Sequence, residues 1–188
     1  MSQASNLIRI VVLCCLIPIV SAAREPEPSF PETIELETGS ILSKTGEYRY
    51  VYRVFFKLYD AALYAAPEVE IEKILAAETS FRLQFRYLRE IEKSIILESS
   101  AKMLEKNLSP DELAQIADRV DRINQAYKTV RDGDRSSLTF IPGRGTSLRI
   151  NGKSVTTIEG EDFAKLYFKI WLGEQPISLP LRESLLGR

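Results

Sequence analysis

The clearest pattern along the chain is the alternation of two kinds of side chain from residue 47 to residue 64, EYRYVYRVFFKLYDAALY. Because successive side chains of a strand point to opposite faces, this pattern predicts one long strand with two different surfaces. The first surface is aromatic and aliphatic and is expected to meet the core; it carries Tyr48, Tyr50, Tyr52, Val54, Phe56 and Leu58. The second surface mixes cations with apolar groups; it carries Arg49, Val51, Arg53, Phe55, Lys57 and Tyr59.

Several shorter strands are predicted on either side of this one. Residues 79–88 alternate regularly, which is typical of a half-buried strand. A turn at Lys44-Thr45-Gly46 is expected to lead into the long strand, and Asn151-Gly152 predicts a tight hairpin turn. The remaining strands are expected over residues 33–38, from residue 41, and over 137–141, 147–150 and 155–158.

Apolar residues that recur every three or four positions predict the helices. They indicate helices over residues 68–77, 89–108, 161–172 and 179–186. A further helix is expected to start at Pro110, with Ser109 as its N-cap and Glu112 completing a capping box. The order of strands, a helical pair, strands and helices predicts an α+β fold, in which an antiparallel sheet is covered by helices on one side.

The N-terminal residues have a different character. Residues 1–23 combine a basic Arg9, an apolar run from Ile10 to Val20 and a small-residue end, which is typical of a secretory signal peptide. Cleavage is expected after Ala22 or Ala23, and a short membrane anchor is the alternative. Residues 24–32 contain three prolines and are expected to form a mobile lead-in. The protein is therefore predicted to be periplasmic or secreted, with one domain over residues 33–188.

Composition excludes several classes of function. The chain has 25 basic and 26 acidic residues, so no strong basic field is available for nucleic acid. It has no histidine, and both cysteines fall in the signal segment. A Cys/His zinc site, a Ser-His-Asp triad and a Cys-His nucleophile are therefore not expected. We predict no metal, no cofactor and no catalytic residue.

The cationic surface of the predicted long strand carries the candidate site. Arginines beside apolar side chains would suit a ligand with a charged head and an apolar tail. The candidate ligand-binding residues are Arg49, Arg53, Phe55 and Tyr59. The alternative is a half-solvated sheet face whose long basic side chains reach out to water.

Three stretches resemble the bacterial chalcone isomerase-like family, in the same order along nearly the whole chain. The first is residues 55–64, FFKLYDAALY. The second is Gly133-Asp134 followed by FIPG at 140–143 and Gly145-Thr146. The third runs from Gly160 through IWLG at 170–173 and Pro176 to LLG at 185–187. The resemblance implies an open-faced β-sandwich, a large antiparallel sheet covered by helices with a ligand cleft between them.

The resemblance also suggests how a ligand would be held. The family includes plant flavonoid isomerases, plastid fatty-acid-binding proteins and bacterial members that look non-catalytic. In the binding members an arginine and a tyrosine of the long strand hold a carboxylate, and the tyrosine matches Tyr59. The Gly-x-Gly-x-Arg motif of the family is missing here, so the arginine would be Arg49 or Arg53, with Arg49 fitting the spacing better.

Three functions are left open by these observations. The leading one is a non-catalytic binding protein for a fatty acid or a similar apolar anionic small molecule. The alternatives are an intramolecular lyase of the chalcone isomerase type and an interaction module of the cell envelope whose cleft is closed. The sequence predicts no membrane span once the signal is removed, and it does not indicate the oligomeric state.

Overall fold

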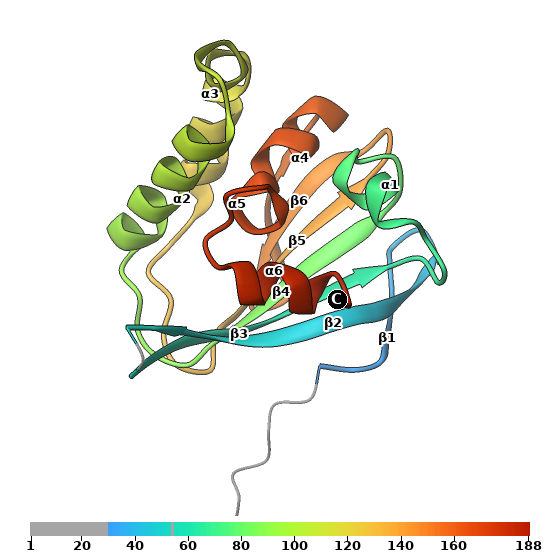
Figure 1. The fold of residues 1–188 in the computed structure, drawn as a ribbon, viewed down its shortest axis with the longest axis horizontal. Coiled ribbons are helices and arrows are strands. Elements are labelled where there is room, and N and C mark those ends of the chain that lie inside the picture. Colours follow the sequence, from blue (N-terminus) through green and yellow to red (C-terminus); the bar gives the residue numbers. More distant parts are fainter. Residues whose placement is uncertain (1–29, 54) are drawn as a thin grey trace, which may run out of the picture.

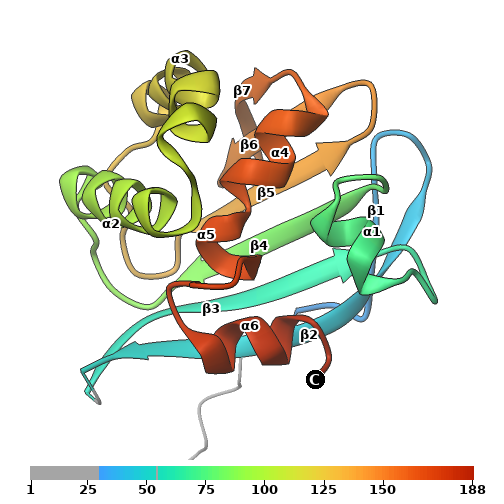
Figure 2. The same cartoon turned by 45° about the horizontal axis from the view of Figure 1, so that its top comes forward.

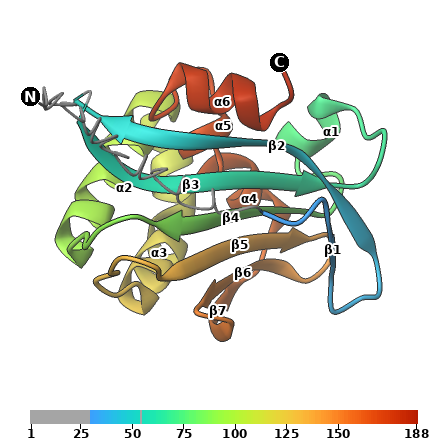
Figure 3. The ribbon, with the colours of Figure 1, turned by 90° about the horizontal axis from the view of Figure 1, so that it is seen from below.

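One curled antiparallel sheet organises the protein. The computed structural model describes residues 30–53 and 55–188, so the predicted signal peptide and most of the predicted lead-in lie outside the described residues. The strands pair in chain order, and Figure 3 shows β2 to β7 side by side in this order. They are β1 (Thr33–Glu35), β2 (Ile41–Tyr52), β3 (Phe56–Ala65), β4 (Phe81–Tyr87), β5 (Arg135–Ile141), β6 (Gly145–Ile150) and β7 (Lys153–Ile158).

The helices cover one face of this sheet, which we call the inner face (Figures 1 and 2). Helices α2 and α3 form a pair at one end of the molecule, and α6 lies along β2 (Figure 2). The predicted α+β fold is confirmed. The helices are α1 (Ile71–Leu75), α2 (Lys93–Asn107), α3 (Pro110–Ala126), α4 (Glu161–Tyr167), α5 (Lys169–Leu172) and α6 (Leu179–Leu185). Within the described part of the chain, no helix has the length and hydrophobicity needed to cross a membrane.

The main core lies between the inner face and the helices. Directly paired residues of neighbouring strands share a face, so the strand register sorts the apolar side chains into rows. One such row, fully buried, contains Leu63, Leu83, Leu138 and Leu148. The helices contribute Ile116, Ile123, Phe163 and Ile170 to the same core. Each of these side chains stabilises the fold by about 1.5–3 kcal/mol on burial.

A smaller cluster lies on the other face of the sheet, which we call the outer face. Phe30, only 3% exposed, packs there with Leu36, Leu42, Ala62 and Tyr64. The Tyr64 hydroxyl donates to the carbonyl oxygen of Pro31 at 2.9 Å. The packed domain therefore includes residues just before position 33, where the sequence analysis placed its start.

The predicted long strand over residues 47–64 is wrong, because the chain reverses within it. β2 ends at Tyr52 and β3 begins at Phe56, and between them Arg53 adopts a left-handed conformation with φ of 46°. Tyr50 then pairs with Tyr59, and Arg49 pairs with Asp60. A bulge next to the Tyr50–Tyr59 pair shifts the register, which changes the face of the side chains beyond it.

Two smaller predictions also need correction. The expected turn at 44–46 lies inside β2, where the register shifts and Gly46 passes directly beneath α6. A Cβ atom at Gly46 would clash with the carbonyl oxygen of Ser184, so glycine permits this close packing. The single helix expected over 161–172 is divided into α4 and α5 at Phe168. The capping box of α3 and the Asn151-Gly152 hairpin turn are confirmed.

Candidate ligand-binding site

Three tyrosines form a row across the inner face at the end of the sheet near α2. Tyr59 of β3 pairs with Tyr50 of β2 on one side and with Tyr87 of β4 on the other. The Tyr59 ring lies 5.2 Å from the Tyr50 ring and 6.3 Å from the Tyr87 ring, measured between centroids. It also packs edge-on against Phe85 at 5.3 Å. These contacts fix the direction of the Tyr59 side chain.

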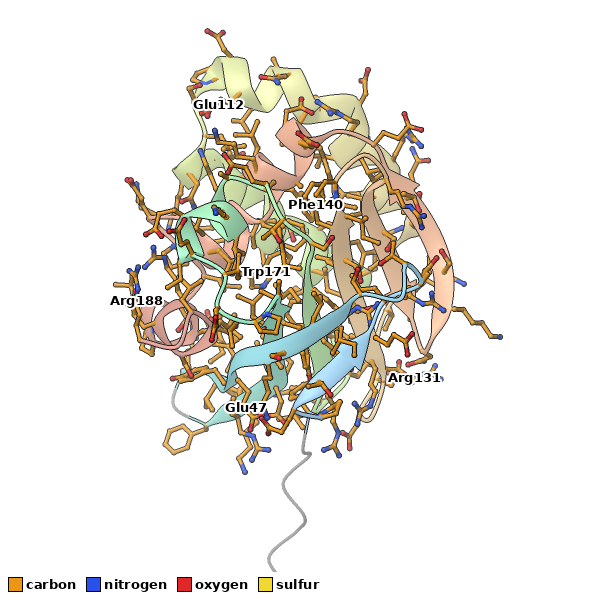
Figure 4. All side chains as sticks on the ribbon, turned by 90° about the vertical axis from the view of Figure 1, so that its right-hand side faces the viewer. Glu47, Glu112, Arg131, Phe140, Trp171 and Arg188 are labelled. Carbon is orange, nitrogen blue, oxygen red and sulfur yellow. The ribbon has the colours of Figure 1, made fainter. Side chains whose placement is uncertain are left out.

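This row forms one wall of a cavity of about 80 Å³, and helices α2 and α5 form the opposite wall. Trp171 of α5 lies in the interior of the molecule, between the sheet and the helices (Figure 4). Among the described residues, no charged side chain lines the cavity. The lining consists of Tyr50, Leu58, Tyr59, Phe85, Tyr87, Ile91, Ile95, Ile96, Ser99, Ser100, Tyr127, Ile170, Trp171 and Ile177.

The Tyr59 hydroxyl is the exceptional polar group of this cavity. It is buried and donates no hydrogen bond to any described residue; the nearby Trp171 indole N–H is itself a donor and cannot accept from this hydroxyl. Burial raises the pKa of Tyr59 far above its usual value, and Tyr50 and Tyr87 raise it further, while the Trp171 indole opposes this shift. Tyr59 therefore stays protonated at neutral pH. A buried donor without a partner is costly, so it indicates a place for a ligand atom or a water molecule.

The neighbouring phenols are also neutral. The Tyr87 hydroxyl forms a hydrogen bond of 2.9 Å with Ser136, and burial raises the pKa of Tyr87 to about 12. Burial likewise raises the pKa of Tyr127 well above its usual value, with a further rise from Tyr167. The cavity therefore offers aromatic and aliphatic surface and neutral hydroxyl groups.

Only one of the four predicted site residues lines this cavity. The prediction that Arg49, Arg53 and Phe55 share a face with Tyr59 is wrong, because it depended on an unbroken strand. Arg49 lies on the outer face, where its guanidinium donates to both carboxylate oxygens of Asp60 at 2.6 and 3.1 Å. Arg53 lies in the connecting turn, 5.3 Å from the centre of the Tyr52 ring, and Phe55 is 84% exposed.

Sequence reasoning missed most of the cavity lining. Tyr87 could have been found, because it continues the apolar face of the alternating strand that contains Phe85. Two polar residues of the helical side, Tyr127 and Asn107, have different places. Tyr127 lines the cavity. Asn107 instead bonds the backbone of Gln175, donating to its carbonyl oxygen at 2.8 Å and accepting from its N–H at 3.0 Å.

A larger hollow of about 300 Å³ lies between α1, the end of α2 and α4–α5. Its rim carries Lys106, Lys165 and Lys169, and Lys169 contacts Glu112 at 3.4 Å. In contrast to the Tyr59 cavity, none of the residues lining it has a buried polar atom that lacks a partner. The described residues contain no group of three or more His, Cys, Asp or Glu side chains that could hold a metal ion.

Comparisons with known proteins give the family. The profile of the chalcone isomerase-like family matches residues 29–187. A search of curated proteins finds no match. Among solved structures, the chain is similar to the Arabidopsis thaliana fatty-acid binding protein AtFAP1, with a TM-score of 0.61 and 13% sequence identity over 83% of this chain and 96% of that one. At this identity the likeness shows a shared fold. Since the family profile spans nearly the whole described domain, the chain belongs to the chalcone isomerase-like family.

Proposed function

We propose that the protein binds a fatty acid or a similar apolar anionic small molecule in the Tyr59 cavity, without catalysing a reaction. The observation that carries this proposal is the buried Tyr59 hydroxyl, a donor that has no acceptor among the described residues and lies in an aromatic and aliphatic wall. The similarity in fold to a fatty-acid binding protein supports it. The apolar lining would bury the ligand tail, at about 0.8 kcal/mol for each methylene group.

The head of the ligand would be held by hydroxyl groups. Tyr59 would donate to a carboxyl oxygen, and Ser99 and Ser100 line the same cavity. The described residues that line the cavity include no arginine to offset the cost of burying a carboxylate, and burial raises the pKa of a carboxylic acid. The bound acid would therefore have a higher pKa than the free acid. Affinity would be greatest below the free pKa, about 4.3 for a side-chain carboxyl, and would fall as the pH rises through the bound pKa.

The size of the cavity places a condition on this proposal. A volume of about 80 Å³ is well below the roughly 300 Å³ at which small-molecule pockets begin, so the cavity must widen around a long tail. The side of α2 offers the route, because Ile95 lines the cavity and is nevertheless 50% exposed. A tail entering beside Ile95 would reach the Tyr59 hydroxyl without crossing the sheet.

The first experiment is to extract the purified protein and identify bound lipids by mass spectrometry, followed by calorimetric titration of delipidated protein with palmitate. Tyr59→Phe removes one hydroxyl and is expected to weaken binding by up to about tenfold, because a hydrogen bond between neutral groups contributes about 0.5–1.5 kcal/mol. Ser99→Trp is expected to abolish binding by filling the cavity. Tyr52→Phe, at the exposed hairpin end, is the matched control and should leave affinity unchanged.

Binding that survives both Tyr59→Phe and Ser99→Trp would refute the Tyr59 cavity as the site. Loss of binding in Lys106→Gln would then move the site to the hollow between α1 and α4–α5. Absence of any bound lipid, together with no rise in Tm on adding palmitate, would refute lipid binding. Turnover of a chalcone above the buffer rate would instead establish the intramolecular lyase.

The small cavity favours a second candidate, an interaction module of the cell envelope whose cleft is closed by its own side chains. In that case cross-linking in cells would recover one stoichiometric partner, and Ser99→Trp would leave that complex intact. For either function we propose export, with the signal peptide removed after Ala22 or Ala23. Intact-mass measurement of the mature protein from cell fractions tests this proposal, and recovery of the uncleaved chain from the cytoplasm would refute it.

A further inference from the structure

Four arginines surround a small polar area on the outer face of the sheet, opposite to the helices. Arg82 and Arg86 flank Gln84 along β4, at positions two residues away on the same face. Ser137 of β5 pairs with Gln84 and with Arg149 of β6. Arg135 lies two residues before Ser137. The register therefore places the four arginines around Gln84 and Ser137 on one face of the sheet, with Arg86 at the edge of this area.

The strand register makes this arrangement electrostatically unfavourable. Arg86 pairs directly with Arg135, and like charges at such a position repel each other. Arg82 is half-buried; burial lowers its pKa, and the charge of Arg149 lowers it further. An anion bound between the arginines would relieve this repulsion. The charge arrangement of the unbound sheet therefore favours anion binding.

The acids near this area are already engaged. Asp60 lies beside Arg86 in the sheet, but both of its oxygens accept hydrogen bonds from Arg49. Glu37 forms an ion pair with Arg149 at 3.0 Å. Asp134 accepts from the Asn151 amide at 2.9 Å and from the Arg131 N–H at 2.8 Å.

The arginines differ in how firmly they are held. Arg82 donates through Nε to the Thr139 hydroxyl at 2.7 Å, and Arg149 donates to the carbonyl oxygen of Gly152 at 2.7 and 3.2 Å. Their guanidinium groups are thereby oriented before any ligand binds. For Arg86 and Arg135, in contrast, no ion pair forms with any residue of 30–53 or 55–188. These two charges are available to a ligand.

A shallow hollow of about 220 Å³ marks the same place. It is lined by Arg82, Gln84, Arg135, Ser136, Ser137, Arg149 and Gly152. The volume is below the roughly 300 Å³ of a pocket for a whole organic ligand, so it suits a compact group. Guanidinium groups recognise phosphate by paired, charge-assisted hydrogen bonds, and several of them can contact the tetrahedral oxygens at once.

We propose that the outer face of the sheet carries a binding site for a phosphate group, formed by Arg82, Arg86, Arg135 and Arg149 around Gln84 and Ser137. The phosphate belongs either to a soluble phosphate ester or to a lipid headgroup. This site is separate from the Tyr59 cavity, because the sheet lies between them. Its test is therefore independent of the proposed fatty-acid binding.

The experiment uses the mature protein in low-salt buffer and two probes. Calorimetric titration with inorganic pyrophosphate tests a soluble phosphate, and co-sedimentation with phosphatidylcholine vesicles, with or without phosphatidic acid, tests a headgroup. The variants are Arg86→Gln and Arg135→Gln. Arg122→Gln on α3 is the control, because it removes the same charge from an exposed position on the helical side of the sheet.

We expect Arg86→Gln and Arg135→Gln each to weaken binding of at least one probe about ten- to a hundredfold, and Arg122→Gln to change it less than twofold. In the absence of phosphate, Arg86→Gln should raise Tm, because the repulsion between Arg86 and Arg135 is removed. Binding of pyrophosphate alone supports a soluble ester, and binding of phosphatidic acid vesicles alone supports a headgroup. No binding of either probe, or an equal loss in Arg122→Gln, would overturn the proposal.

Discussion

Replacing Tyr59 by phenylalanine tests whether its hydroxyl is held without a partner. The substitution removes a single oxygen atom and keeps the ring contacts with Tyr50, Phe85 and Tyr87. A buried polar group without a hydrogen bond costs about 1–3 kcal/mol. Because the Trp171 indole is close, we take the lower end and expect Tyr59→Phe to raise the free energy of unfolding by about 1 kcal/mol. For a domain of this size that corresponds to a rise in Tm of about 2–4 °C.

Tyr87→Phe is the matched comparison, because the same chemical change is made one strand away. The Tyr87 hydroxyl is paired with Ser136, and its removal leaves the buried Ser136 hydroxyl without this partner. We expect Tyr87→Phe to lower the free energy of unfolding by about 1–2 kcal/mol. The two substitutions should therefore shift stability in opposite directions.

Urea denaturation of delipidated protein, followed by circular dichroism, measures both effects. The two variants and the unchanged protein should have equal m-values, so that a shift of the midpoint reports stability alone. If Tyr59→Phe destabilises the protein as much as Tyr87→Phe, the Tyr59 hydroxyl has a partner in solution. The hydroxyl would then not be free to bind a ligand, and the Tyr59 cavity would lose its main support as the site.

Three further predictions concern packing and charge. Gly46→Ala should lower the free energy of unfolding by at least about 2 kcal/mol, measured by thermal melting, because its Cβ would meet the Ser184 backbone; a change of a few tenths would contradict this. Asp162 has a lowered pKa because Arg119 donates hydrogen bonds to it, so its contribution to stability is present above the unfolded pKa of about 3.9 and is lost as the pH falls through the folded value. Arg119→Gln should remove this part of the acid dependence in melts at graded pH, and an unchanged profile would exclude it. Phe55→Ser should change stability by less than about 0.5 kcal/mol in the same melts, and a larger loss would mean that this exposed ring is covered in solution.

The elements with local signatures could be predicted from the sequence. The start of α3 follows from Ser109 and Glu112, and the β6–β7 turn follows from Asn151-Gly152, because each signature satisfies its own backbone within a few residues. The position of β4 could be predicted from the alternation of apolar and polar residues, because one face of this strand is buried and the other is partly exposed. For these elements the side chains that determine the structure are neighbours in sequence.

The β2–β3 turn could not be predicted in this way. It contains no glycine, asparagine or proline, and Arg53 adopts a left-handed conformation that is uncommon for a residue other than glycine. Side chains of a strand alternate between the two faces, so a shift of one residue moves a side chain to the opposite face. The turn and the bulge were not predicted from the sequence, and Arg49 was therefore placed on the face of Tyr59. Tyr59 remained in the predicted site, although its partners are other tyrosines and not arginines.

The strand order has a consequence for how the chain folds. Every strand pairs with its neighbour in sequence, so β1–β4 and β5–β7 can each form through short connections. Pairing of β4 with β5 is the exception, because it must close the segment that contains α2 and α3. We expect two local meanders to form early and to join last, because closing the long segment between β4 and β5 costs conformational entropy. Pulsed hydrogen exchange during refolding should then protect the amides of the β2–β3 and β6–β7 pairs before those that join β4 to β5, and simultaneous protection would contradict this order.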